Sequence, residues 1–208
     1  MICTLCSSEL TNRKDAYYYD CDICKAIVKD KKYYLAANEE KAIYETHNND
    51  VNDIRYQNFT SPITNYVIKN FLPEHKGLDF GSGTGPVISS MLMEMSYDIV
   101  QYDPFFAPNQ NTLNDTYDYI VSCEVFEHFY NPKIEIDGLT ALLKINGVLL
   151  IMTMLYNDQI EFNKWNYRRD ATHVFIYRRE TIEYIARTKK FEIDVLTDRF
   201  VVLRRVHY

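Results

Sequence analysis

A glycine-rich segment is the first feature of this sequence with the chemistry of a ligand-binding loop. It reads Leu78-Asp79-Phe80-Gly81-Ser82-Gly83-Thr84-Gly85-Pro86. Glycine lets the backbone turn sharply and approach a ligand, and a helix that follows presents unpaired amide groups. The dinucleotide fingerprint G-x-G-x-x-G would need its third glycine at Pro86, and this mismatch disfavours a nicotinamide-dependent oxidoreductase. The predicted ligand-binding residues of the segment are Asp79, Gly81, Ser82, Gly83 and Gly85.

Four cysteines near the N-terminus form a candidate metal site. They occur as two C-x2-C pairs separated by 14 residues, and the ligands would be Cys3, Cys6, Cys21 and Cys24. Four thiolates on two knuckles suit the closed tetrahedral arrangement of structural zinc. A segment this small cannot bury enough core to fold alone, so metal binding would supply the missing stability. We therefore expect a zinc ribbon over residues 1–35, with a short strand at residues 16–19; four core cysteines without metal are the alternative.

Two histidines and a carboxylate have the chemistry of proton transfer. His128 directly follows Glu127 after an apolar run, and His173 ends a polar and aromatic segment that begins at Trp165. A histidine or carboxylate within hydrogen-bond reach of an acceptor can remove its proton. We predict Glu127, His128 and His173 as catalytic residues; the alternative is that both histidines only satisfy local backbone groups. The candidate substrate-binding residues are Trp165, Tyr167, Arg168 and Asp170.

Apolar strand patterns alternate with helical patterns from Lys76 onward. This alternation predicts parallel strands joined by crossover helices, with helices after Gly85, Asn131 and Arg179. The last two strands are separated by too few residues for a crossover and must form an antiparallel hairpin. The predicted strands are residues 77–80, 99–102, 117–123, 147–153, 191–196 and 200–204.

Two helices are expected between the cysteine pairs and the alternating region. The first spans residues 38–49, with Asn38 as its cap and Ile43 and His47 one turn apart. The second begins at Ser61 as N-cap, with Pro62 at the first helical position. We therefore divide the chain into a zinc-ribbon module at residues 1–35, a helical linker at 36–60 and a catalytic domain at 61–208.

The glycine loop, in its strand-turn-helix setting, resembles motif I of class I S-adenosylmethionine-dependent methyltransferases. The resemblance covers roughly residues 60–208. Asp103 ends the strand in the sequence IVQYD, about 20 residues beyond the loop, as expected of a ribose-binding acid in a doubly wound fold. Residues 117–128 resemble the family's fourth strand and following loop, and GVLLIMT at 147–153 resembles the fifth. The resemblance implies S-adenosylmethionine as cofactor, and its predicted contacts extend to Asp103, Pro104 and Glu124.

The chain departs from the family pattern at one edge of the sheet. Only 14 residues separate Asp103 from Asp118, which are too few for the usual helix and third strand. We therefore expect an α/β, Rossmann-like, doubly wound and mostly parallel sheet with an antiparallel last strand and an abbreviated third strand. The residue that reads adenine is not assigned, and Asn114 and Asp115 are the nearest candidates.

The composition restricts the class of protein. Hydrophobic residues make up 47% and charged residues 25% of the 208 residues, which is typical of a globular chain. The net charge of -6 disfavours nucleic-acid binding. No apolar run is long enough to span a membrane, and the first residues lack the pattern of a secretory signal, so we expect a cytoplasmic protein with no membrane partner.

The combination of a zinc ribbon with this core is similar to a group of bacterial methyltransferases that act on sugars or other small metabolites. The resemblance implies methyl transfer from S-adenosylmethionine to a small-molecule or sugar acceptor. Two alternatives stay open: an RNA or protein acceptor recognised by the ribbon, and a non-catalytic zinc-binding scaffold. The sequence does not indicate an oligomeric state.

Overall fold

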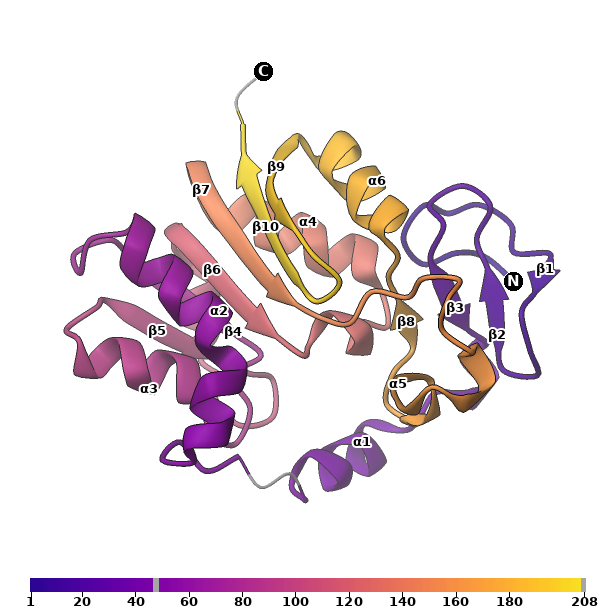
Figure 1. The fold of residues 1–208 in the computed structure, drawn as a ribbon, viewed down its shortest axis with the longest axis horizontal. Helices are drawn as coiled ribbons and strands as arrows, with labels where there is room; N and C mark the ends of the chain where they lie inside the picture. Colours follow the sequence, from indigo (N-terminus) through magenta and orange to yellow (C-terminus); the bar gives the residue numbers. More distant parts are fainter. Residues whose placement is uncertain (47–48, 207–208) are drawn as a thin grey trace.

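The central element is a six-stranded sheet with the order β5-β4-β6-β7-β10-β9 (Figure 1). The structure, a computed structural model, describes residues 1–46 and 49–206. The first four strands in that order are parallel, whereas β10 is antiparallel to both β7 and β9. The strands are β4 (Gly77–Phe80), β5 (Ile99–Tyr102), β6 (Tyr117–Cys123), β7 (Leu143–Met152), β9 (Phe191–Leu196) and β10 (Phe200–Arg205).

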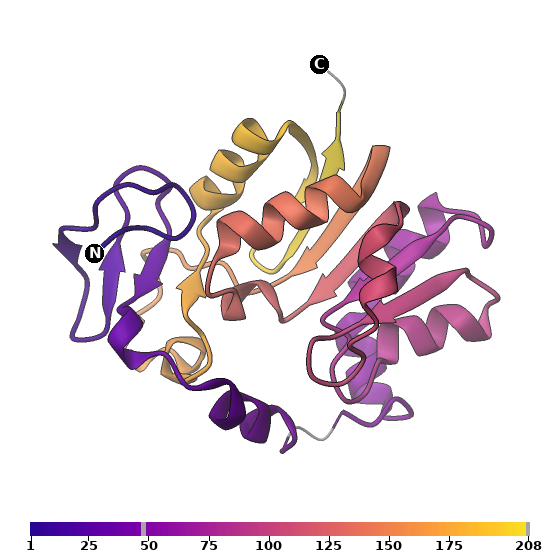
Figure 2. The same cartoon turned by 180° about the vertical axis from the view of Figure 1, so that it is seen from behind.

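Helices cover both faces of this sheet. Helices α2 (Ile54–Asn70) and α3 (Val87–Glu94) lie on one face, and α4 (Pro132–Leu142) and α6 (Arg179–Lys189) lie on the other (Figures 1 and 2). Successive strand residues point to opposite faces, and the two cores alternate accordingly. In β7, for example, Leu150 belongs to the core under α2 and α3, while its neighbour Ile151 belongs to the core under α4 and α6. The predicted doubly wound fold is confirmed.

The abbreviated edge of the sheet is also confirmed. Between β5 and β6 the described chain forms only a 3-10 helix, η2 (Gln110–Asn114), so β5 is the edge strand. Asp115 lies after this turn and pairs with Lys76. The 14 residues between Asp103 and Asp118 therefore close a short connection instead of adding a strand.

Both predicted helix starts before the sheet were wrong. Helix α1 (Ala37–Tyr44) is capped by Ala36, whose backbone N–H donates to the Glu39 carboxylate over 2.9 Å. Helix α2 begins at Ile54 with Asp53 as its N-cap, so Ser61 and Pro62 lie inside it. Proline cannot donate to the carbonyl four residues earlier, but the Ser61 hydroxyl donates to that carbonyl, on Asn58, over 2.8 Å. The predicted contact of His47 lies outside the described residues.

The N-terminal segment forms a small sheet, and a strand from later in the sequence completes this sheet. Strands β1 (Asn12–Arg13), β2 (Tyr18–Asp20) and β3 (Ile27–Lys29) are antiparallel, and β8 (Phe175–Ile176) pairs with β3. The remaining short elements are η1 (Lys31–Tyr33), η3 (Phe126–His128), η4 (Phe162–Lys164) and α5 (Asn166–Arg169). None of the helices in the described chain has the length and apolar character needed to cross a membrane.

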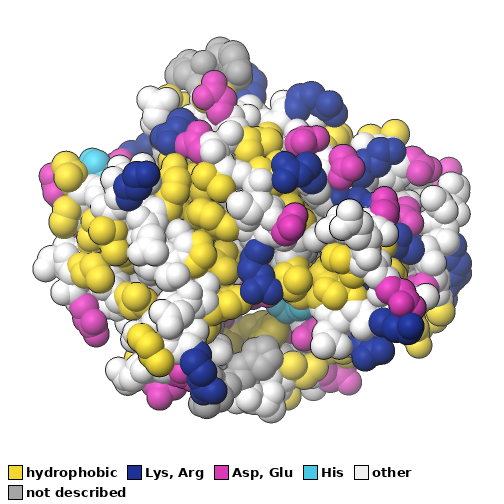
Figure 3. Space-filling model, in the orientation of Figure 1, with side chains coloured by type: hydrophobic (Ala, Val, Ile, Leu, Met, Phe, Trp, Pro, Cys, Tyr) yellow, Lys and Arg dark blue, Asp and Glu magenta, His cyan; other side chains and the backbone are white. Residues whose placement is uncertain are grey.

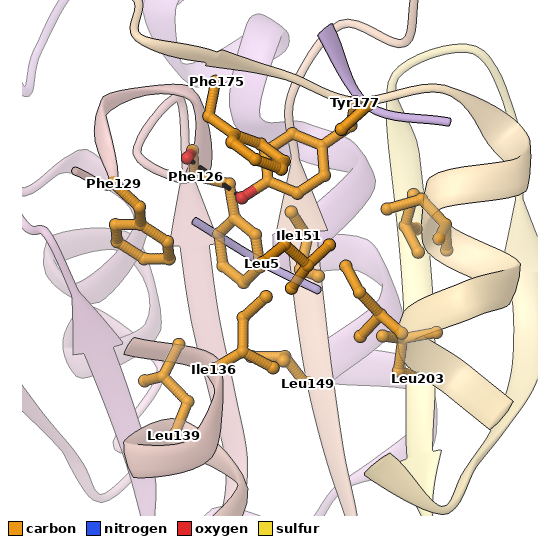
Figure 4. Packing of buried hydrophobic residues seen from close by; sticks show 14 of the residues in the cluster. Leu5, Phe126, Phe129, Ile136, Leu139, Leu149, Ile151, Phe175, Tyr177 and Leu203 are labelled. Atoms are coloured by element: carbon orange, nitrogen blue, oxygen red, sulfur yellow. Dashed lines mark hydrogen bonds between the residues drawn. The ribbon is translucent and has the colours of Figure 1, made fainter. Parts of the chain in front are cut away.

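The cysteine-bearing segment also shares its core with the large sheet. Leu5 is buried in the same cluster as Phe126, Ile151 and Tyr177 (Figure 4). The hydroxyl of Tyr177 donates to the carbonyl of Phe126 over 3.2 Å and fixes the ring in this cluster. Because one continuous core links the two parts, we expect them to unfold together.

Replacing Leu5 with alanine tests this shared core. Leu5 is 4% exposed, and Leu→Ala changes at buried sites cost roughly 2–5 kcal/mol. We expect the free energy of unfolding to fall by an amount in this range, with a single cooperative transition in urea followed by circular dichroism. The control is Ile23→Ala, at a side chain that is 59% exposed, where the change should stay within about 0.5 kcal/mol. A separate early transition in Leu5→Ala would contradict the shared core.

Candidate functional site

A cavity of about 660 Å³ lies at the carboxyl ends of β4, β5 and β6. Figure 3 shows the surface hollowed in this region, with apolar side chains inside the hollow and a histidine at its rim. Ligands of open α/β sheets bind at this edge. The predicted residues that line the cavity are Gly81, Ser82, Gly83, Asp103, Pro104, Glu124, His128, Tyr167, Asp170 and His173.

The glycine loop follows β4 and borders the cavity with left-handed backbone. Gly81 has φ +79° and Gly83 has φ +66°, which side chains rarely tolerate. A Cβ atom at Gly81 would lie 2.4 Å from a methyl carbon of Val125. At Gly85 it would lie 1.6 Å from the backbone oxygen of Asn49, so this glycine lets the linker cross the loop. Gly85 itself does not line the cavity.

Asp103 ties the glycine loop to the turn that follows β5. Its Oδ2 accepts a hydrogen bond from Gly83 N over 3.0 Å. Its Oδ1 accepts from Phe105 N over 2.8 Å and from Phe106 N over 3.0 Å. The side chain is 7% exposed and still lines the cavity. A carboxylate oxygen accepts more than one hydrogen bond, so Asp103 can hold the loop and also accept from a ligand hydroxyl.

Asp79 lies beneath the loop and outside the cavity lining. Its Oδ2 accepts from Ser89 N over 3.3 Å in the first turn of α3. Burial raises the pKa of this carboxyl from 3.8 to about 6, because the charged form loses its hydration. The structure therefore places Asp79 as a support for the loop and helix, one layer away from any ligand in the cavity.

Glu127 is fully buried at the end of a directed hydrogen-bond chain. Met154 N donates to the Tyr167 hydroxyl over 3.2 Å, and that hydroxyl lies 2.7 Å from Thr153 Oγ1. Thr153 Oγ1 in turn donates to Glu127 Oε2 over 2.9 Å. The other oxygen, Oε1, has no hydrogen-bond partner within the described part of the chain. One face of this buried carboxyl is therefore satisfied and the other is not.

The two predicted catalytic histidines are brought together, with ring centroids 4.8 Å apart. His173 Nδ1 donates to the Tyr167 carbonyl over 2.7 Å, and His128 Nδ1 donates to the Thr172 carbonyl over 3.2 Å. Burial lowers the pKa of His173 to about 4, so its ring is neutral at pH 7. Its Nε2 then carries a lone pair and lies 4.0 Å from Glu127 Oε1.

Glu124 is a second buried carboxyl, and it faces the cavity directly. It has φ +53°, an unusual backbone conformation for a residue other than glycine. Burial raises its pKa, and the negative charge of Glu127 raises it further. Burial raises the pKa of Glu127 as well. Of these two carboxyls only Glu124 lines the cavity, and Glu127, predicted as a catalytic residue, lies outside the lining.

Two predicted substrate-binding residues, Trp165 and Arg168, do not line the cavity. The guanidinium of Arg168 pairs with Asp15 over 2.5 Å and lies over the ring of Tyr17, because α5 turns this side chain toward β2. Trp165 stacks on Tyr167 with ring centroids 5.0 Å apart and packs in a separate small cluster. Both predictions are corrected: these side chains anchor the loop to the N-terminal sheet.

Several cavity residues were not predicted from the sequence. Helices α1 and α2 and the segment between them contribute Glu40, Tyr44, Asn49, Tyr56 and Phe59. The spacing of these residues in the sequence does not indicate ligand binding. They come close to the glycine loop only because the folded linker passes next to it. The turn after β5 adds Phe105 and Phe106, whereas the adenine candidates Asn114 and Asp115 lie outside the lining.

The four cysteine sulfurs meet as predicted. All lie within 4.8 Å of one another, with Cys3 and Cys24 3.6 Å apart and Cys6 and Cys21 3.4 Å apart. Sulfurs at 2.3 Å from a tetrahedral zinc would be about 3.8 Å apart, so the set fits this ion.

The N-terminal sheet holds the loop that carries His173. Tyr18 donates from its hydroxyl to the His173 carbonyl over 2.8 Å, and Lys29 Nζ donates to the Ala171 carbonyl over 2.6 Å. Val174 N donates to the Glu127 carbonyl over 2.9 Å. Residues 170–176 are therefore fixed by the cysteine-bearing sheet on one side and by η3 on the other.

Comparison with known proteins identifies the fold. The family described as methyltransferase domain matches residues 35–195. A Burkholderia thailandensis 1,6-didemethyltoxoflavin-N1-methyltransferase is similar in structure, with a TM-score of 0.57 and 12% identity over 92% of this chain and 100% of that one.

Two further structures show the same fold. Human N-acetylserotonin methyltransferase has a TM-score of 0.55 and 11% identity, over 83% of this chain and 61% of that one. Magnesium protoporphyrin IX methyltransferase from Synechocystis has a TM-score of 0.52 and 13% identity, over 84% and 94%. No curated protein matched the chain significantly.

Asp79→Asn tests the burial of a charge beneath the loop. The folded wild type binds this proton more tightly than the unfolded chain does, so its stability falls as pH rises from about 4 through about 6. The amide keeps an acceptor for Ser89 N but carries no charge. We expect the variant's stability relative to wild type to rise by roughly 1 kcal/mol or more between pH 5 and pH 8, measured by urea unfolding. The exposed Asp98→Asn is the control, and an equally flat profile for Asp79→Asn would contradict the assignment.

Proposed function

The chain belongs to the methyltransferase domain family, and on that premise we propose that it transfers a methyl group from S-adenosylmethionine to a small-molecule acceptor. The observation that carries this proposal is the joint placement of the left-handed glycine loop and Asp103 on one cavity. The loop supplies close backbone approach, and the carboxylate supplies acceptors for hydroxyl groups. Both are the requirements of a nucleoside ligand.

The residues present fit S-adenosylmethionine. Gly81, Ser82 and Gly83 would border the cofactor, Asp103 would accept from its ribose hydroxyls, and Pro104 would flank it. When bound, this cofactor supplies an activated methyl group on a sulfonium. Glu124 lines the cavity beside the loop, and a cationic ligand there would favour its charged form, which burial otherwise disfavours.

The acceptor side of the cavity is formed by the loop around His173. We propose His128, His173 and Glu127 as catalytic residues, and Tyr167 and Asp170 as residues that shape the acceptor pocket. His173 offers a lone pair instead of a proton at neutral pH, because burial lowers its pKa. This side of the cavity therefore suits an acceptor that loses a proton. Most of the reduction in the activation barrier would come from aligning the acceptor with the methyl group.

The size and cover of the cavity support a small acceptor. Its volume of about 660 Å³ falls within the range of roughly 300–1,000 Å³ that is typical of small-molecule sites. Side chains of α1 and α2, including Tyr44 and Tyr56, cover part of it. The similar structures include a toxoflavin-precursor and a protoporphyrin methyltransferase. A sugar acceptor is compatible with the same cavity.

We also propose that the four cysteines hold structural zinc. The support is the thiol tetrahedron together with the contacts of Tyr18 and Lys29 to the loop of His173. Zinc would fold the N-terminal sheet, and that sheet would hold the acceptor side in place. In this proposal the ribbon holds the loop of His173 in place and makes no contact with the acceptor.

Gly81→Ala tests the cofactor loop. The added methyl group would meet Val125 at 2.4 Å in backbone that already disfavours a side chain. We expect the affinity for S-adenosylmethionine and S-adenosylhomocysteine to fall at least tenfold in titration calorimetry. Gly83→Ala, which has open space at its Cβ, should have a smaller effect.

Gly138→Ala is the matched control for this test. Gly138 lies in α4 with nothing within 4 Å of an added Cβ, so the variant should bind like wild type and gain up to about 1 kcal/mol of stability. Absence of cofactor binding by the wild type at sub-millimolar concentration would favour a non-catalytic scaffold. Full affinity in Gly81→Ala would place the cofactor elsewhere.

Cys24→Ser tests the zinc proposal. Cys24 is fully buried among the other thiols, and a serine hydroxyl does not replace a thiolate ligand. We expect the purified variant to carry one zinc fewer per chain, by elemental analysis, and to melt at a lower temperature. Cys123→Ser, at the fifth cysteine, should keep the zinc content of wild type. Equal zinc content in both variants would contradict the assignment.

A further inference from the structure

We propose that Glu127, His128 and His173 together bind a divalent transition-metal ion at the wall of the cavity. One ligand atom from each of these side chains lies within 4.8 Å of the others. The site is separate from the cysteine cluster and uses nitrogen and oxygen ligands in place of sulfur.

The carboxylate of Glu127 supplies the strongest observation. Its side chain is fully buried, and Oε1 accepts no hydrogen bond from an N–H or O–H donor of the described residues, although the carboxyl also meets that of Glu124. Burying such an oxygen without a donor is costly. The chain of donors from Met154 through Tyr167 and Thr153 is directed at the other oxygen, Oε2. The protein has therefore fixed this carboxylate through one oxygen and left the second oriented toward His173.

Both histidines are held in the tautomer of a metal ligand. The Nδ1 proton of each ring is donated to a backbone carbonyl, on Tyr167 for His173 and on Thr172 for His128. Metal-binding histidines are usually oriented by a donation of this kind, which places the ligand lone pair on Nε2. For His173 that nitrogen is the atom 4.0 Å from Glu127 Oε1.

The ligand atoms are farther apart than they would be around a bound ion. Ligands at about 2.1 Å from a tetrahedral ion are about 3.4 Å apart, whereas Glu127 Oε1 and His173 Nε2 are 4.0 Å apart and the three ligand atoms lie within 4.8 Å of one another. Binding would therefore draw the three side chains together by up to roughly 1.4 Å. Metal binding would also satisfy Oε1.

The surrounding charges favour a cation. Glu124 lines the cavity beside Glu127, and Asp170 Oδ2 lies 3.9 Å from His173 Nε2. Lys29 directs its ammonium group to the Ala171 carbonyl, and Arg199 is the positive charge that acts on Glu124. A bound divalent ion would lie next to the acidic side chains of Glu124 and Asp170 as well as its own ligand Glu127.

Two imidazoles and one carboxylate suit zinc, manganese, iron and similar ions, whereas magnesium and calcium prefer oxygen ligands. Three protein ligands leave coordination positions open toward the cavity. An oxygen atom of the methyl acceptor would fit such a position and lose its proton more readily there. This last consequence rests on the proposed function, whereas metal binding itself does not.

Manganese titration of protein that carries one zinc per chain, held by the cysteines, tests the site in the absence of S-adenosylmethionine. Mn²⁺ binds weakly to thiolates and does not displace zinc from cysteines, so its loss from solution, followed by electron paramagnetic resonance, reports nitrogen and oxygen sites. We expect one Mn²⁺ per chain with micromolar affinity. His173→Ala and Glu127→Gln should each weaken binding at least tenfold, and the second variant keeps an acceptor for the Thr153 hydroxyl.

The control is His75→Ala, which removes a histidine far from the cavity and should leave Mn²⁺ binding unchanged. Circular dichroism and zinc content establish that each variant is folded. Absence of saturable binding below millimolar Mn²⁺, or equal affinity in wild type, His173→Ala and Glu127→Gln, would overturn the proposal. Cofactor binding is measured separately, so either proposal can fail without the other.

Discussion

The pairing of β8 with β3 is the interaction on which the rest of the site depends. This pairing joins β8, which follows His173 in the chain, to the cysteine-bearing sheet. Between His173 and β8, Val174 N donates a hydrogen bond to the carbonyl of Glu127. A loop of this length would otherwise be exposed and variable in position. Both sides of the loop are therefore held, the His173 ring is oriented by its hydrogen bond to the Tyr167 carbonyl, and the His128 ring lies against it.

Buried carboxyls are concentrated at the carboxyl ends of the central strands. Asp79 lies in β4, Asp103 follows β5, and Glu127 and the part-buried Glu124 follow β6. Such groups are expensive to bury unless they accept hydrogen bonds or meet a positive charge. Asp103 is satisfied by three backbone amides, whereas Glu124 and Glu127 each retain an oxygen without a partner in the described chain. The difference separates a carboxylate that is fully bonded within the loop from two that each keep an oxygen without a donor.

The architecture of the sheet was predictable because it depends on local patterns. Strands β4, β5, β6 and β9 have the predicted bounds, since each is a short apolar run between turn residues. The predicted start of α2 was wrong for an equally local reason. Ser61-Pro62 has the pattern of a helix start, yet the serine hydroxyl satisfies the carbonyl that the proline leaves unpaired, and the helix continues through it.

The sequence by itself determined most strands of the large sheet, the glycine loop, the position of Asp103 after β5 and the cluster of four cysteines, because spacing along the chain is enough to specify them. Only the tertiary structure decided what faces the cavity. Glu127 and His173 meet through strand pairing between distant segments, Arg168 turns away to Asp15, and α1 adds lining residues. These outcomes depend on how the N-terminal sheet, the helices α1 and α2, and the large sheet pack on one another. Residue type and spacing in the sequence do not predict that packing.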